Sequence, residues 1–364
     1  MKPLEGIRIL AVEHFGAGPY GTMFLASLGA EVVRIEHPGT GGDPARRVGP
    51  HLLGGADSEY FQSWNLNKTS IALDLKSERG SFEKLVAGAD AVANNLRGDL
   101  PARLGLDYAS LSGIKPAIVC AHVSAYGRDN ERASWPGYDY LMQAEAGLMS
   151  LTGEPDGPPA RFGTSIIDCM AGMTAAAGLL ACLLRARQTG KGGDVDTSLF
   201  DVALHQLGYA GTWYLNEGRV STRVPRSAHF SLTPVQTFPS ADGWIFVMCM
   251  TDKFWNVLVE ILSRPDLARD ERFETQAARL EHRAKLTEIL DAEFRRRSTA
   301  HWLAKLAGRV PVAPVNDLRQ AMENPFVAAT GMVRTAPHPE KPDFRVLACP
   351  VKIDGIRPDP QVCK

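Results

Sequence analysis

Short apolar runs alternate with helix-forming stretches through the first third of the chain. We predict strands at residues 7–12, 30–36, 70–75, 91–95 and 117–123, with helices at 20–28 and 76–89 between them. Parallel strands need crossover connections, and helices usually provide them. The alternation therefore predicts an α/β fold, with a doubly wound, Rossmann-like sheet in a large domain.

The pattern changes after residue 165. Helical periodicity is expected at residues 169–187 and 197–217, followed by a polar, proline-bearing linker at 219–228. Residues 235–250, with Asp242-Gly243 in the middle, predict a β-hairpin, and helices follow at 254–262 and 283–294. This part reads as a smaller α+β segment of different composition.

Composition narrows the class of protein. The 364 residues carry a formal net charge of -1, which gives no global attraction to nucleic acid or to an anionic membrane. None of the six cysteines is paired as C-x-x-C, so we expect reduced thiols. The N-terminus lacks a basic segment followed by an apolar core, and the apolar stretch 169–184 suits a buried helix. We therefore expect a cytoplasmic protein without nucleic-acid or membrane partners.

Asp168 stands where a short apolar run meets an Ala/Gly-rich helical pattern. A helix start offers unpaired N–H groups and the positive end of the macrodipole, and both favour the ionised form of a carboxyl group. We therefore predict that Asp168 is a carboxylate at neutral pH. Local sequence leaves two roles open, a helix cap or a nucleophile.

Several polar groups near predicted strand ends suit an anionic ligand. Gly16, Gly18 and Gly21 match G-x-G-x-x-G, and Glu36 stands where a ribose-binding acid would lie, so a dinucleotide is one hypothesis. Another phosphate ligand at the helix start is an alternative. Lys76 and Arg97 suit phosphates but are also compatible with ordinary surface charges. The histidines fit no metal spacing, so no metal site is predicted.

These residues occur in the order and spacing of the class III CoA-transferases, the family of formyl-CoA:oxalate and carnitine CoA-transferases. The chain resembles that family over nearly its whole length. The matching blocks are Pro3-Leu4-Glu5-Gly6, Gly16-Ala17-Gly18-Pro19, Leu28-Gly29-Ala30-Glu31, Asn67-Lys68, Leu73-Asp74-Leu75-Lys76, Gly137-Tyr138-Asp139, Gly163 to Asp168, and Thr189-Gly190-Lys191-Gly192.

The resemblance implies that Asp168 is the nucleophile. It would carry CoA from an acyl-CoA donor to a carboxylic acid, expected to be dicarboxylic, through an aspartyl anhydride and an enzyme–CoA thioester. Coenzyme A is then a substrate, and no permanently bound cofactor is implied. The CoA contacts carried over by position are Phe15, Gly16, Ala17, His37, Leu73, Lys76, Asn95, Leu96, Arg97, Arg103 and Tyr138.

Two departures from the family pattern concern the acyl group. Oxalate-using members have a glycine-rich loop where this chain has residues 227–234, which contain no glycine, and a glutamine where this chain has Gly16. Both departures favour a different acyl pair. The sister branch, α-methylacyl-CoA racemase, has a histidine near the place of Tyr138. A racemase and a catalytically silent CoA-binding protein remain the alternatives.

The resemblance also implies an architecture. We expect a large CoA-binding domain at residues 1–218, an inserted small α+β domain at 225–315, and a tail at 316–364 that returns to the large domain. Members of the family form an interlocked homodimer, so self-association is the expected protein partnership.

Overall fold

The computed structural model describes residues 2–364, which separate into two compact units. The first unit comprises Met1–Leu148, Phe162–Gly208 and Pro325–Lys364, and the second comprises Met149–Arg161 and Tyr209–Asn324. The first unit therefore draws on both ends of the chain.

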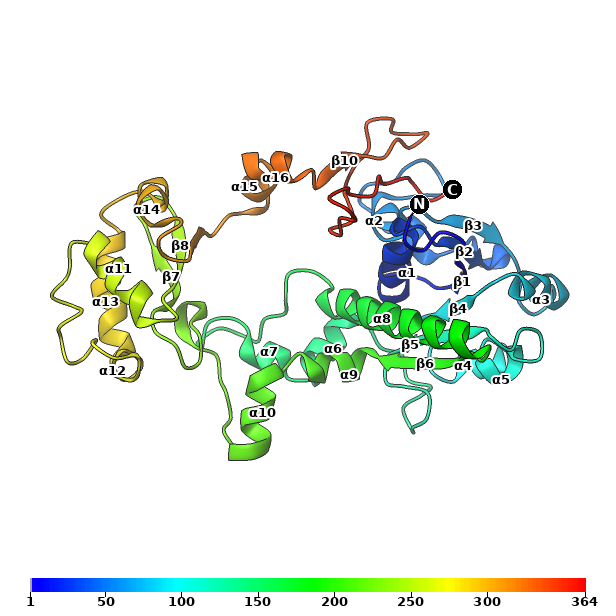
Figure 1. The fold of residues 1–364 in the computed structure, drawn as a ribbon, viewed down its shortest axis with the longest axis horizontal. Coiled ribbons are helices and arrows are strands. Elements are labelled where there is room, and N and C mark those ends of the chain that lie inside the picture. The colour runs from blue at the N-terminus through cyan, green and yellow to red at the C-terminus, as the bar shows by residue number, and fades with distance from the viewer. Residues whose placement is uncertain (1) are drawn as a thin grey trace. The chain divides into compact units, whose positions relative to one another are not determined.

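The first unit is built on a six-stranded sheet of order β3-β2-β1-β4-β5-β6, in which all neighbours are parallel (Figure 1). The predicted α/β class is confirmed, and the strand order is the one typical of a doubly wound sheet. The strands are β1 (Arg8–Val12), β2 (Glu31–Glu36), β3 (Thr69–Ala72), β4 (Ala91–Asn94), β5 (Val119–Ser124) and β6 (Gly193–Ser198).

Helices cover both faces of this sheet because the inner strands are apolar on both sides. Ile9 and Ala11 of β1 join a core formed with α1 (Ala17–Ser27) and α8 (Ile166–Thr189), whereas Leu10 joins an opposite core that includes Phe82. Phe82 belongs to α3 (Arg79–Ala87). The remaining helices of this unit are α2 (Glu59–Asn65), α4 (Leu100–Arg103), α5 (Tyr108–Leu111), α6 (Asp139–Glu145), α9 (Leu199–His205) and α16 (Pro325–Thr330), with 3-10 turns η1 (Pro38–Thr40) and η2 (Pro44–Arg47).

Helices α1 and α8 meet at their backbones. A Cβ atom added at Gly172 would come within 2.8 Å of the Gly21 nitrogen and closer still to the Ala17 oxygen. One added at Gly21 would come within 2.9 Å of the Gly172 carbonyl carbon. Glycine is needed at both positions because the two helices leave no room for a side chain where they touch.

The structure differs from one expectation in the middle of the chain. We predicted one helix over residues 197–217, but β6 ends at Ser198 and the helical part divides into α9 and α10 (Gly208–Glu217). Strand β6 lies at the edge of the sheet and pairs only with β5. Its sequence, GDVDTS, is polar because one side of an edge strand faces solvent, so it lacks the apolar signature of the inner strands.

The second unit has its own core around a three-stranded antiparallel sheet of order β7-β8-β9. The predicted hairpin is confirmed, since β7 (Val235–Pro239) pairs with β8 (Trp244–Met248), and β9 (Val312–Pro314) adds to it. Besides α10 and α7 (Leu148–Leu151), which lie at its boundaries with the first unit, the helices of this unit are α11 (Asp252–Ile261), α12 (Gln276–Glu281), α13 (Arg283–Phe294), α14 (Thr299–Leu306) and α15 (Leu318–Met322). The 3-10 turn η3 (Pro225–Ser227) precedes β7.

The last part of the chain returns to the first unit. Strands β10 (Val333–Thr335) and β11 (Arg345–Leu347) form a separate antiparallel pair, and Cys363 packs against Phe61 and Ala45. One helix, α8, is long and apolar enough to cross a membrane by length and composition alone. Its buried residues Ala176, Leu179 and Leu183 belong to the core beneath the sheet.

The helix crossing gives a testable prediction. Gly172→Ala should lower the free energy of unfolding by about 1–3 kcal/mol, because the added methyl group forces α1 and α8 apart. Urea denaturation followed by circular dichroism measures the change. Gly80→Ala is the matched control, because a Cβ atom at Gly80 in α3 meets nothing within 4 Å. It should leave stability unchanged or raise it through better helix propensity, and equal losses in both variants would contradict the packing argument.

Candidate active site

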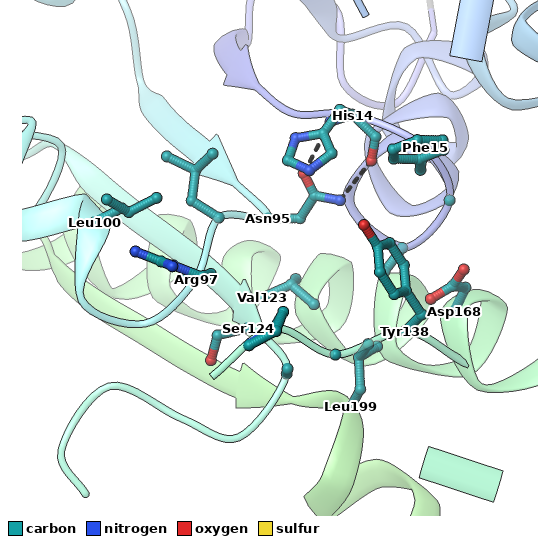
Figure 2. A pocket seen from close by; sticks show the side chains of 16 residues that line it. His14, Phe15, Asn95, Arg97, Leu100, Val123, Ser124, Tyr138, Asp168 and Leu199 are labelled. Atoms are coloured by element: carbon teal, nitrogen blue, oxygen red, sulfur yellow. Dashed lines mark hydrogen bonds between the residues drawn. The ribbon is translucent and has the colours of Figure 1, made fainter. Parts of the chain in front are cut away.

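A cavity of about 280 Å³ opens at the carboxyl ends of β1, β4 and β5 (Figure 2). Strand order reverses between β1 and β4, and doubly wound folds bind ligands at such a switch point. Figure 2 shows Asp168, Tyr138 and Phe15 on one side of the cavity and Arg97 and Leu100 on the other. The lining residues are His14, Phe15, Gly16, Ala17, Asn95, Leu96, Arg97, Leu100, Val123, Ser124, Ala125, Pro136, Gly137, Tyr138, Asp168 and Leu199.

The loop after β1 is held in one conformation from two sides. The Asn95 side chain accepts a hydrogen bond from the His14 amide at 2.9 Å and donates one to the His14 carbonyl at 2.7 Å, as the dashed lines in Figure 2 mark. Phe15 has a φ of 58°, and its amide donates to Asp43 at 3.3 Å. A left-handed φ is unfavourable for a phenylalanine, so these contacts hold the backbone in a strained turn that directs Gly16 and Ala17 into the cavity.

A buried ionic cluster supports the same loop from below. Arg34 donates to the Glu13 carbonyl at 3.0 Å and to Asp43 at 2.7 Å, and Lys68 pairs with Glu13 at 2.7 Å. Burial lowers the pKa of Lys68 to about 8 against the opposing charge of Glu13. Removing one partner from such a buried cluster leaves an uncompensated charge, which typically costs several kcal/mol. The cluster therefore fixes the position of the loop strongly.

Asp168 is the third residue of α8, and its carboxyl group reaches the cavity. Across residues 2–364, no hydrogen bond or ion pair engages its carboxylate oxygens. The group does not cap its own helix, which begins at Ile166 without a side-chain cap. A Cβ atom placed on Gly16 would lie 3.0 Å from the Asp168 Cγ atom and closer to Oδ2, so the acid rests against the start of α1.

The ionisation of Asp168 differs from our expectation. Burial, together with the charge of Asp139, raises the pKa of Asp168 to about 7. This shift opposes the ionisation that we predict from the helix start, because a carboxyl group with a pKa near 7 titrates around neutral pH instead of well below it. At the start of α8, the Asp168 amide donates its hydrogen bond to a second acid, Asp139. The local sequence around Asp168 does not reveal this neighbour.

Asp139 provides the contact that a cap would make. Its Oδ2 atom accepts a hydrogen bond from the Asp168 amide at 2.9 Å, and its Oδ1 atom accepts one from Gln143. We assigned no role to Asp139 from sequence. Its spacing of four residues from Gln143 on one helix was the available signal, since residues i and i+4 lie on the same helix face.

The structure brings most of the predicted CoA contacts to this edge of the sheet. Phe15, Gly16, Ala17, Asn95, Leu96, Arg97 and Tyr138 line the first cavity with Asp168. A second cavity of about 220 Å³ is lined by His37, Leu73, Lys76 and Leu96, among others, and Leu96 belongs to both. The two cavities therefore adjoin at Leu96.

Arg103 is the exception among the predicted contacts. It is not among the residues that line either cavity, and it is exposed. It pairs with Asp99 at 3.1 Å, and the same Asp99 pairs with Arg97 at 3.2 Å. His14, Ser124 and Leu199 line the first cavity without having been predicted, because neither their spacing nor their neighbours mark them.

The glycine fingerprint has a packing explanation. Gly16 faces Asp168, Gly21 faces Gly172, and a Cβ atom at Gly18 would lie 3.0 Å from Asn95. Glu36 is buried, and although burial alone would raise its pKa, hydrogen bonds from Arg46 and Ser70 and the charge of Arg34 lower it to about 2. An acid engaged in this way does not present its oxygens to a ribose, which argues against a dinucleotide. Within residues 2–364, His, Cys, Asp and Glu form no group that could hold a metal ion.

Comparisons with known proteins show the family of this chain. The model of CoA-transferase family III matches residues 4–362.

The succinate–glutarate CoA-transferase of Agrobacterium fabrum is 33% identical over 338 residues, covering 91% of this chain and 84% of the relative. The acetyl-CoA:oxalate CoA-transferase of Acetobacter aceti is 35% identical over 336 residues, covering 91% and 85%. A solved CAIB/BAIF family protein from Brucella suis superposes with a TM-score of 0.85 at 31% identity, covering 100% of this chain and 96% of that one. The chain therefore belongs to CoA-transferase family III and is a CoA-transferase of that class.

Proposed function

We propose that this enzyme moves CoA from an acyl-CoA donor to a dicarboxylic acid, with Asp168 as the nucleophile. The observation that carries the proposal is an acid without a partner in the described chain, facing a cavity beside a second cavity that contains Lys76. An ionised carboxylate needs no general base to attack a thioester.

The first half of the reaction forms the enzyme–CoA thioester. An Asp168 oxygen attacks the thioester carbonyl of the donor, the C–O bond forms, and the C–S bond breaks as CoA leaves with the electron pair as a thiolate. The product is a mixed anhydride. The thiolate then attacks the aspartyl carbonyl, and the donor acid leaves as a carboxylate.

The second half repeats these steps in reverse with the acceptor. The acceptor carboxylate attacks the aspartyl–CoA carbonyl and releases CoA thiolate, which gives a second anhydride. The thiolate attacks the acceptor carbonyl, and Asp168 leaves as a carboxylate. Each step makes one bond and breaks one, so the free energy of the thioester is conserved as long as water is excluded.

The start of α1 supports a role in stabilising the oxyanion of each addition step. Among residues 2–364, no hydrogen bond uses the amides of Ala17 and Gly18 in the first turn, and Gly16 lies against Asp168. Free N–H groups at a helix start, beside the nucleophile, are suited to bind developing negative charge. For CoA itself we propose Lys76, Arg97, Arg103 and His37 as the groups near its phosphates, with Leu73, Leu96 and Tyr138 as apolar contacts.

The acceptor class rests on the relatives. Proteins similar to this chain include a succinate–glutarate CoA-transferase and succinyl-CoA:glutarate and succinyl-CoA:mesaconate CoA-transferases. We propose a C4 or C5 dicarboxylate as acceptor, and succinyl-CoA with glutarate as the first pair to assay.

The assembly is proposed from the family pattern. We propose an interlocked, cytoplasmic homodimer, with a small domain at 225–315 inserted into the large domain and a tail at 316–364. The membership of Pro325–Lys364 in the first unit supports the returning tail. Met173 and Leu184, large apolar side chains exposed on α8, support a protein partner on that helix.

Substitution of Asp168 tests the mechanism. Asp168→Ala should lower exchange between succinyl-CoA and glutarate at least about 1000-fold, because the group that forms the covalent intermediate is gone. Wild-type enzyme incubated with donor alone should also yield a CoA thioester that hydroxylamine or borohydride traps at Asp168, as mass spectrometry of the peptide would detect. Asp129→Asn, a change in an exposed loop, is the control and should retain full exchange.

Other outcomes would identify the alternatives. Full exchange in Asp168→Ala would overturn the proposed nucleophile. Deuterium incorporation at the α-carbon of a 2-methylacyl-CoA without any acceptor would instead indicate a racemase. Tight CoA binding without turnover on any acid would indicate a binding protein.

Gly16 offers a second test that leaves Asp168 itself unsubstituted. Gly16→Ala should lower kcat by about 10- to 100-fold, because the new methyl group meets the Asp168 carboxyl group and displaces it. The φ of Gly16 is -109°, so the backbone itself tolerates alanine. Gly113→Ala adds a methyl group into open space and should change kcat little. Equal kcat in Gly16→Ala and wild type would show that the reacting carboxyl group lies elsewhere.

A further inference from the structure

Asp139 is a deeply buried acid at the start of α6, with a side chain 3% exposed. Its two oxygens join separate elements, since one accepts from the Asp168 amide in α8 at 2.9 Å and the other accepts from Gln143 in α6. Buried acids without such partners are strongly unfavourable, so these bonds define where the carboxyl group stays.

Gln143 extends the connection to the segment before the nucleophile. Its side chain is 2% exposed, and its oxygen accepts a hydrogen bond from the Phe162 amide at 2.9 Å. The amide of Gln143 is thus used at both ends, toward Asp139 and toward residue 162. The chain from 162 to 168 is therefore held at both ends by α6.

We propose that Asp139 is a positioning residue of the transfer reaction, which fixes the first turn of α8 through the Asp168 amide and whose charge favours the acylated forms of Asp168. The inference rests on the proposed role of Asp168 as nucleophile. Asp139 makes no hydrogen bond to the Asp168 carboxylate oxygens, and it is not among the residues that line the cavity.

The effect of the Asp139 charge on the reaction follows from the charge of Asp168 before and after acylation. Asp168 carries a negative charge as a free carboxylate and none as an anhydride or a thioester. Repulsion from Asp139 therefore acts on the free nucleophile and disappears when the covalent intermediate forms. The same repulsion, added to burial, raises the pKa of Asp168 to about 7, and a more basic carboxylate is a better nucleophile.

Other groups near Asp168 would titrate differently. Tyr60 from α2, whose pKa burial and the Asp168 charge raise to about 12, and Cys169, whose pKa burial raises to about 11, are neutral at pH 7. Tyr20 in α1 also has a raised pKa, chiefly through burial. Burial lowers the pKa of His14, which lines the cavity, and so favours its neutral form. Besides burial, the charge of Asp139 is what raises the pKa of Asp168.

The test compares pH profiles of kcat/KM for succinyl-CoA in three proteins. In wild type, kcat/KM should rise through an acid limb near pH 7 as Asp168 ionises. In Asp139→Asn, which retains an oxygen to accept from the Asp168 amide, the limb should move down by about one pH unit or more. At pH 8 the fraction of enzyme trapped as the CoA thioester with donor alone should fall about tenfold.

Gln143→Ala is the matched comparison, because it removes the partner of Asp139 but keeps the charge. It should lower kcat through a looser segment at 162–168 while leaving the acid limb where it is in wild type. An unmoved limb and an unchanged thioester fraction in Asp139→Asn would overturn the inference. A wild-type enzyme that forms no thioester at all would overturn the proposed function instead, so the two failures are distinguishable.

Discussion

The backbone contact between α1 and α8 is the constraint on which the site depends. Because Gly21 and Gly172 carry no side chains, the helix backbones approach so closely that a Cβ atom on Gly172 would collide with the Ala17 carbonyl oxygen. Both helices begin near this crossing, so the first turn of α1 and the first turn of α8 lie together at the switch point of the sheet. A larger separation would move Asp168 away from the unpaired amides of Ala17 and Gly18.

The arrangement is unfavourable for the free acid and is stabilised by the elements around it. Asp168 is partly buried beside a second acid, and its carboxylate oxygens have no hydrogen-bond partner in the described chain. By contrast, the acids beneath the loop after β1 are matched with cations, as Glu13 is with Lys68 and Asp43 with Arg34. The structure thus neutralises the acids that support the loop and leaves unpaired the one that faces the cavity, which is typical of a reactive group.

Sequence reasoning predicted the fold where local pattern and packing agree. The inner strands β1 and β4 are apolar on both faces, and their runs are visible without a structure. Edge strand β6 was not predicted because it is partly exposed to solvent and therefore has no apolar run in its sequence. The site divides in the same way. Asp168 and Lys76 are marked by family blocks, whereas Asp139 and Gln143 contact α8 and the segment before it, which are separated from α6 in sequence. No periodicity encodes such a pairing.

Of the two roles that the sequence left open for Asp168, the neighbouring Asp139 takes that of the helix cap, and the nucleophile is the role that we propose. A helix cap turns an oxygen toward the amides of its own first turn, whereas a nucleophile turns one toward the substrate. Here Asp139 accepts the bond from the Asp168 amide, and the Asp168 oxygens remain directed into the cavity. Asp139 thus takes the place of a cap at the start of α8, and because its charge lies close to the Asp168 carboxyl group it also raises the pKa of that group. A neutral cap such as serine would accept the hydrogen bond from the amide equally well. Only an acid at position 139 would also repel the free Asp168 carboxylate, so capping alone does not account for the choice of an acid there.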